Sequence, residues 1–165
     1  MKTLILMRHS HAASDNPAYT DHDRPLTHEG RTLATTTSKL LTNWPIDEII
    51  CSSATRTMET ADLLASELSS PLTPHTRKEL YLAPPGAYST AALSIPNISS
   101  ECIAIIGHNP GIASLICTWA NDSLPVSPAT VAVFELAIDD WKELSNSSQV
   151  TKQLTGLISN GVRVR

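Results

Sequence analysis

Two segments of the sequence place a histidine directly after a run of apolar residues. Residues 4–7 are apolar and lead into Arg8 and His9, and residues 103–106 are apolar and lead through a glycine into His108. Continuous apolar runs of this length are typical of short strands that are buried on both faces. Because ligands of open α/β sheets bind beyond the carboxyl ends of the strands, we expect both histidines to lie at one ligand site.

A third segment delivers an arginine to the same predicted edge. Residues 46–51 are typical of a strand, and Arg56 follows at the start of a predicted helix. A cation there opposes the helix dipole, and an anion lying between them would offset that cost. Guanidinium groups bind phosphate oxygens bidentately and keep their charge, whereas a neutral imidazole can attack phosphorus. Arg8, Arg56 and the histidines therefore predict a pocket for a compact dianion such as phosphate. Ser10 and the backbone amides that begin at Asn109 would line it.

Phosphoryl transfer also needs a group that protonates the leaving oxygen. Residues 77–81 would supply it, and Glu79 is the acid of that segment. A metal site built from His9, His11, His22 and an aspartate is the competing interpretation. Its spacing matches no standard ligand motif, and two nearby arginines would repel a cation. We therefore expect neither a metal nor another cofactor, and a chelator would decide between the two interpretations.

The composition is that of one globular domain covering residues 1–165. Hydrophobic residues make up 41% and charged residues 17%, and the net charge is −4. A general nucleic-acid or membrane-surface binder would carry a basic excess, so we expect neither kind of partner. Every apolar run is shorter than the roughly 20 residues of a membrane span, and the first is shorter than a signal-peptide core. These patterns favour a cytoplasmic protein and indicate nothing about its oligomeric state.

The predicted order of elements is β-α-β-α-β-(α)-β-α-β-β. This order favours a three-layer α/β/α fold with a mostly parallel central sheet and an antiparallel addition at the end. Thr27 is expected to cap a helix whose apolar face runs to Trp44 and which Pro45 ends. Asn109 is expected to cap the helix that starts at residue 110. Residues 71–74 would form a short edge strand at best, and residues 139–149 a hairpin-type connection.

Four blocks of the sequence carry a family resemblance. They are residues 8–10 (RHS), 24–30 (RPLTHEG), 52–61 (SSATRTMETA) and 107–110 (GHNP). In this order they resemble the motifs of the histidine phosphatase (phosphoglycerate-mutase-like) superfamily. The short chain, the lack of a helical insertion between residues 82 and 101, and the triplet 79–81 resemble the compact SixA-type branch, the phosphohistidine phosphatases. The resemblance implies a phosphoglycerate-mutase-like fold without a large insertion subdomain.

The resemblance also implies roles for particular residues. His9 would be the phosphorylated nucleophile, and Arg8, Arg56 and His108 would bind the phosphoryl group. Glu79 would be the acid/base by its position. The sequence departs from the larger family at residue 10, where Ser10 stands in place of the usual glycine. It departs from the compact branch at residue 11, where that branch often has a charged residue in place of the histidine.

The leading functional hypothesis is a metal-independent phosphatase that works through a phosphohistidine intermediate. An open site without a lid favours a phosphohistidine-bearing protein domain as the substrate. A small phosphomonoester is the alternative substrate, and a non-catalytic phosphate-binding module is the alternative function. The presence of His9, His108 and Glu79 together favours an enzyme over the module.

Overall fold

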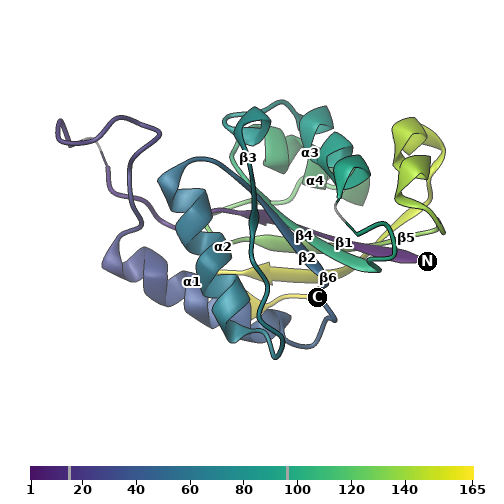
Figure 1. Cartoon of the computed structure of the whole chain (residues 1–165), viewed down its shortest axis with the longest axis horizontal. Coiled ribbons are helices and arrows are strands. Elements are labelled where there is room, and N and C mark those ends of the chain that lie inside the picture. The colour runs from purple at the N-terminus through teal and green to yellow at the C-terminus, as the bar shows by residue number, and fades with distance from the viewer. Residues whose placement is uncertain (15, 96) are drawn as a thin grey trace.

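The computed structural model describes residues 1–14, 16–95 and 97–165, and in these residues one seven-stranded sheet forms the middle layer (Figure 1). The strand order is β3-β2-β4-β1-β5-β6-β7. Strands β1 to β4 pair in parallel, and β5 to β7 are antiparallel additions. The strands are β1 (Lys2–Arg8), β2 (Glu48–Ser52), β3 (His75–Arg77), β4 (Cys102–Gly107), β5 (Val131–Leu136), β6 (Lys152–Ser159) and β7 (Val162–Arg163).

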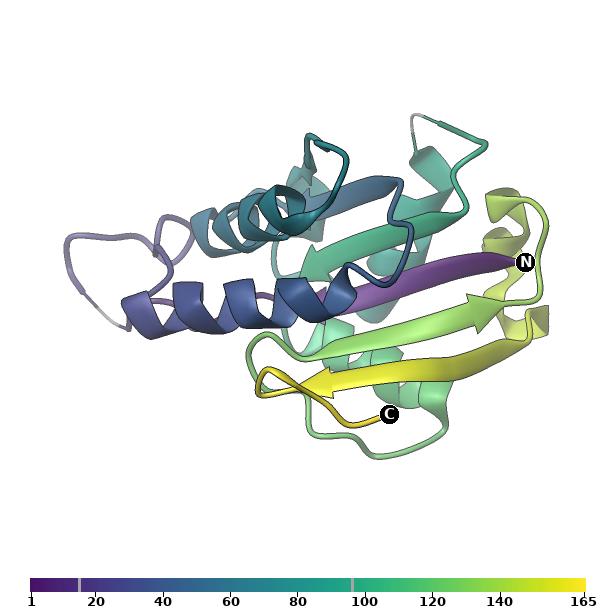
Figure 2. The same cartoon turned by 90° about the horizontal axis from the view of Figure 1, so that it is seen from below.

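Helices cover both faces of this sheet. On one face lie α1 (His28–Leu41) and α2 (Thr55–Glu67), which run side by side in Figure 2, and on the other lie α3 (Pro85–Ala91) and α4 (Gly111–Ala120). Within β1, alternate residues face opposite layers, because Leu4 and Leu6 pack with α3 and α4 whereas Ile5 and Met7 pack with α1 and α2. All four side chains are fully buried, as expected for a strand covered on both faces. The predicted three-layer α/β/α fold is confirmed.

The start of α1 follows the prediction, but its end does not. The Thr27 hydroxyl accepts a hydrogen bond from the Gly30 amide and so caps the helix. The helix ends at Leu41, so Trp44 lies beyond it. Because a proline disfavours helical backbone at the residue before it, the chain leaves the helix ahead of Pro45. Trp44 still packs against the core cluster beneath α1 and α2.

Three connecting segments also differ from the expectations. The edge strand is β3 at His75–Arg77, because the prolines at residues 71 and 74 have no N–H to donate to the ladder. Residues 139–149 contain the 3₁₀ segment η3 (Trp141–Gln149), which is held by an Asp140–Glu143 capping box and buries Trp141. Two further 3₁₀ turns, η1 (Lys78–Leu80) and η2 (Ala92–Ser94), flank α3. No helix in the described residues is long and apolar enough to cross a membrane.

Candidate active site

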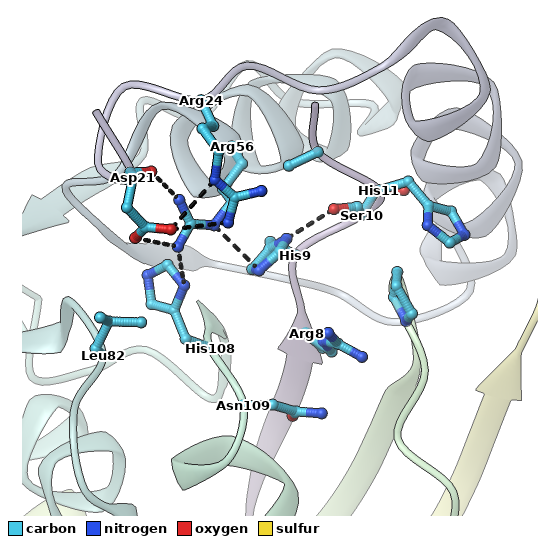
Figure 3. A pocket seen from close by; sticks show the side chains of 12 residues that line it. Arg8, His9, Ser10, His11, Asp21, Arg24, Arg56, Leu82, His108 and Asn109 are labelled. Carbon is cyan, nitrogen blue, oxygen red and sulfur yellow. Dashed lines mark hydrogen bonds and ion pairs between the residues drawn. The ribbon is translucent and has the colours of Figure 1, made fainter. Parts of the chain in front are cut away.

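A cavity of about 370 Å³ opens at the carboxyl ends of the parallel strands. Strands β1 and β4 are neighbours in the sheet, and Arg8 pairs with Gly107, so His9 and His108 leave the sheet side by side. Their ring centroids are 5.2 Å apart. Figure 3 shows Arg56 reaching toward both rings from α2. The structure thus brings together six of the predicted site residues: Arg8, His9, Ser10, Arg56, His108 and Asn109.

The hydrogen bonds of His9 define its tautomer. Its Nδ1 lies 2.7 Å from the carbonyl oxygen of Ser10, which can only accept, so Nδ1 carries the proton. Its Nε2 accepts from Nε of Arg56 at 3.3 Å and therefore holds a lone pair. Burial, reinforced by the charges of His108, Arg56 and Arg8, lowers the pKa of His9 to about 3, although the bond to Ser10 opposes this shift. His9 is therefore a neutral imidazole with an unprotonated Nε2, and it lines the cavity.

His108 adopts the opposite tautomer. Its Nδ1 lies 3.4 Å from a guanidinium nitrogen of Arg56, which can only donate, so the proton sits on Nε2 and is donated to the hydroxyl of Ser52 at 2.7 Å. Burial, and then the charge of Arg56, lowers the pKa of His108 to about 4. The ring is therefore held neutral with a defined orientation.

The backbone of His108 is held by a buried tyrosine. The Tyr88 hydroxyl accepts from the His108 amide at 2.9 Å and donates to the His108 carbonyl at 3.2 Å. This contact requires a glycine just before the histidine. A Cβ at Gly107 would lie 2.2 Å from Cε1 of Tyr88, and a Cβ at Gly111 would lie 2.0 Å from the carbonyl oxygen of Ala83. Both glycines thus let α3 pack closely against the turn between β4 and α4.

Arg56 is buried, with only 2% of its surface exposed, and has an internal counterion that the sequence did not indicate. Its guanidinium donates to the carboxylate of Asp21 at 3.2 Å and to the backbone carbonyl of the same residue. The Tyr81 hydroxyl also donates to this carboxylate, and Arg24 donates to its other oxygen at 2.9 Å. The bond from Tyr81, followed by those from the arginines, holds the pKa of Asp21 well below its usual range. The predicted cost of a cation at this helix start is thus offset by a carboxylate from the loop.

Arg8 and Asn109 are hydrogen-bonded to the same backbone carbonyl group. Both donate to the carbonyl oxygen of Val126, from Nη1 of Arg8 at 3.1 Å and from Nδ2 of Asn109 at 2.9 Å. The prediction that Asn109 caps α4 is wrong, because its side chain is turned to Val126 and the helix begins at Gly111. Nε of Arg8 and Oδ1 of Asn109 are buried and have no hydrogen-bond partner among the described residues.

Ser10 connects the first strand to α1. Its hydroxyl donates to the carbonyl of Gly30 at 2.7 Å, so this hydrogen is committed within the protein. Its amide donates to the hydroxyl of Thr60 at 3.2 Å. Gly30 must lack a side chain here, because a Cβ would lie 2.1 Å from the carbonyl oxygen of His11. Ser10 therefore positions the backbone beside His9, and its hydroxyl is not aimed at a ligand.

Known proteins resemble this chain in sequence and in fold. A profile of the histidine phosphatase superfamily (branch 1) matches residues 4–81, which include Arg8, His9 and Arg56. The candidate phosphohistidine phosphatase SixA from Nakamurella multipartitia is 25% identical, with a TM-score of 0.79 over 99% of this chain and 97% of that chain. The chain resembles the histidine phosphatase superfamily in sequence over residues 4–81 and in fold over nearly its whole length. It is a phosphatase, a hydrolase with a histidine nucleophile, and resembles the SixA-type members of the superfamily.

Two further proteins share this similarity. The structure of the protein histidine phosphatase SixA complexed with tungstate has a TM-score of 0.77 at 20% identity, covering 96% of this chain and 97% of that one. An uncharacterized chloroplastic protein of Arabidopsis thaliana is 27% identical, and the alignment covers 86% of this chain and 70% of that protein.

Within this histidine phosphatase fold, the structure does not bring Glu79 to the cavity. Glu79 lies in η1 with an exposed side chain, and it is not among the residues that line the cavity. The reason is local, because the 3₁₀ turn fully buries Leu80 and so directs the preceding side chain outward. The same segment instead delivers Tyr81, whose ring lies 5.5 Å from that of His108. The proton-donor role predicted for Glu79 has no support from this geometry.

The loop between β1 and α1 contributes more than the sequence indicated. Arg24 of this loop lines the cavity, whereas His22 bonds to the hydroxyl of Ser53 at 2.9 Å and Asp23 is exposed. Asp21 also lines the cavity and was not singled out. No sequence signal identifies Asp21, because the burial of Arg56, which makes a counterion necessary, is known only from the structure. In the described residues, no group of three His, Cys, Asp or Glu side chains is placed to hold a metal ion.

Proposed function

We propose that the chain is a phosphohistidine protein phosphatase in which Nε2 of His9 accepts the phosphoryl group. The observation that carries the proposal is the fixed neutral tautomer of His9, whose unprotonated Nε2 lies 3.3 Å from Nε of Arg56 at the base of the cavity. In the first step this lone pair forms the N–P bond, while the leaving group departs with the electron pair of its own bond to phosphorus. In the second step water attacks the phosphorus, and His9 departs as a neutral imidazole.

Three side chains would bind the phosphoryl oxygens. Arg8 has a buried Nε without a partner, and Arg56 lies between both rings. A bound dianion raises the pKa of a neighbouring histidine, so His108 would gain a proton on Nδ1 and become a second donor. Charge spread over the phosphoryl oxygens in the transition state would then face three cationic groups.

The carboxyl group at the cavity favours a phosphorus–nitrogen substrate. Asp21 is the acid among the described lining residues, and its lowered pKa keeps it ionised at neutral pH. An alkoxide leaving group needs a proton donor, which an ionised carboxylate cannot supply. The imidazole of a phosphohistidine leaves as a neutral ring when its distal nitrogen is protonated, and it needs no such donor.

The surroundings of the cavity are consistent with a protein substrate. In the described residues between α3 and β4 the chain forms only the short turn η2, so no insertion lies over the site there. A phosphohistidine on the surface of a folded partner domain could therefore reach His9. A small phosphomonoester is the alternative substrate, and the protonation argument disfavours it.

The test measures phosphate release together with trapping of the phosphoenzyme. Wild type, His9→Gln and the exposed-site control His28→Gln are each given a phosphohistidine-bearing domain and phenyl phosphate. We expect an acid-labile phosphoenzyme in wild type and the control but not in His9→Gln, and faster release from the phosphohistidine domain. Faster release from phenyl phosphate would assign a small phosphomonoesterase. The absence of release and of a phosphoenzyme in wild type would overturn the proposal in favour of a phosphate-binding module.

A further inference from the structure

Leu82 has a backbone conformation that leucine rarely adopts. Its φ is +48°, in the left-handed region. The clash of Cβ with the backbone makes this region costly for residues other than glycine, while asparagine tolerates it best. In the part of the chain that the structure describes, two of the other three non-glycine residues with positive φ are asparagines, Asn121 and Asn160. A leucine at this position is therefore a strained choice, and strain of this kind is found preferentially at functional sites.

Contacts on both sides of Leu82 maintain this conformation. The preceding Tyr81 is held by its hydrogen bond to Asp21 and by the edge-to-face packing of its ring on His108. The carbonyl of the following Ala83 lies so close to Gly111 that a Cβ there would be 2.0 Å away. The backbone at residue 82 is thus determined by its neighbours, and its side chain takes the direction that they impose.

That direction brings an apolar side chain to the rim of the catalytic cavity. Leu82 lines the cavity on the same side as His108 (Figure 3), yet 54% of its surface is exposed to solvent. An exposed leucine forgoes most of the stabilisation that burial would bring. Neither the backbone conformation nor burial on folding therefore favours leucine at this position.

A second exposed apolar side chain lies beside the same site. Tyr19 is 44% exposed and lines a groove with Pro17, and this groove shares Asp21 and Arg24 with the catalytic cavity. The rim of the cavity thus carries apolar surface, whereas its base carries the arginines and histidines. A phosphoryl group has no apolar atoms, so the rim can add affinity only for the part of a substrate beyond the phosphorus.

We propose that Leu82 is a specificity-determining contact that packs against apolar side chains beside the phosphohistidine of a folded protein substrate. The proposal rests on the proposed function. The two parts of the site suit two parts of one substrate, because the cationic base would bind the dianion and Leu82 would bind the apolar surface around it. The strained backbone keeps this side chain at the rim before the partner arrives, so little conformational freedom is lost on binding.

The test compares two substrates that share a phosphorus–nitrogen bond. One is a phosphohistidine-bearing domain, and the other is phosphoramidate, which has no apolar group. In Leu82→Gly the ratio of kcat/KM for the domain to kcat/KM for phosphoramidate should fall about tenfold. The variant loses the stabilisation that comes from burying the exposed half of the leucine side chain against the partner. The loss should lie in KM. Leu82→Met, which keeps an apolar side chain of similar size, should restore most of the ratio.

The control for a general loss of apolar surface is Ile98→Gly. Ile98 is 58% exposed and lies just ahead of β4, at the opposite end of the parallel strands, so its removal should leave the ratio unchanged. An unchanged ratio in Leu82→Gly would overturn the proposal. Both rates would fall together if Leu82 only positioned Tyr81, and neither rate would fall if Leu82 contacted no substrate. If wild type cleaves phosphoramidate but not the domain, both this proposal and the proposed protein substrate are wrong. That result comes from wild type alone, so it is distinguishable from a failure of the Leu82 proposal.

Discussion

A buried neutral histidine makes the stability of this fold depend on pH. The pKa of His9 is lowered to about 3 from its ordinary 6.5, mainly because the ring is desolvated. Between these two values the unfolded chain binds a proton that the folded chain does not, so the free energy of unfolding falls as the pH falls. From pH 7 to pH 5 the loss caused by this one residue is about 2 kcal/mol. Since pH 5 is still well above the folded pKa, this figure depends on the unfolded pKa and hardly on the folded one.

The assay is urea unfolding of wild type and His9→Gln at pH 7 and pH 5, followed by tryptophan fluorescence at constant ionic strength without phosphate. Wild type should lose about 2 kcal/mol more than the variant, because glutamine does not titrate and the two proteins share every other titratable group. The variant His108→Gln should give a similar difference, since the pKa of His108 is lowered to about 4. Equal losses in wild type and His9→Gln would refute the reasoning, because His9 would then titrate in the folded protein as it does in the unfolded chain.

Three further predictions concern the groups around the histidines. Ser52→Ala removes the acceptor of the Nε2 proton of His108. The free energy of unfolding should therefore fall by about 1–3 kcal/mol, and kcat should fall with it. If neither quantity changes, the assigned tautomer of His108 is wrong. Gly107→Ala places a Cβ 2.2 Å from Tyr88 and should destabilise by about 1–3 kcal/mol in urea unfolding. The control Gly86→Ala should not, because a Cβ there meets nothing within 4 Å, and equal effects would count against the close packing of Tyr88. Excess EDTA should leave phosphate release unchanged, and a loss that zinc or magnesium restores would favour the metal site instead.

Much of the site could be predicted because its residues follow apolar runs. A strand buried on both faces has a composition that is recognisable locally, and β1 and β4 are such strands. Parallel strands end at one edge of the sheet, so the side chains that follow them must converge. The strand ends were enough to bring His9, His108, Arg8 and Arg56 together, and the four motif blocks added the family resemblance and the roles that it implies.

The rest could not be predicted because it depends on contacts between residues distant in the chain. Asp21 lies in a loop without periodicity, and its position is set by hydrogen bonds to residues 35 and 60 positions away, Arg56 and Tyr81. Glu79 has the residue type of an acid catalyst, but the burial of Leu80 directs it to solvent. Asn109 has the residue type of a helix cap, yet a carbonyl from residue 126 takes its amide.

The sequence by itself determined which chemical groups this protein brings to a phosphoryl group, because the types and order of the motif residues are local properties. Only the tertiary structure decided the state of those groups. It buries His9 and His108, assigns their tautomers through Ser10, Ser52 and Arg56, and supplies an ionised carboxylate in place of the expected one. The physical reason is that protonation and hydrogen bonding depend on desolvation and on distances of a few ångströms between side chains. Such distances exist only after segments far apart in the chain have packed together.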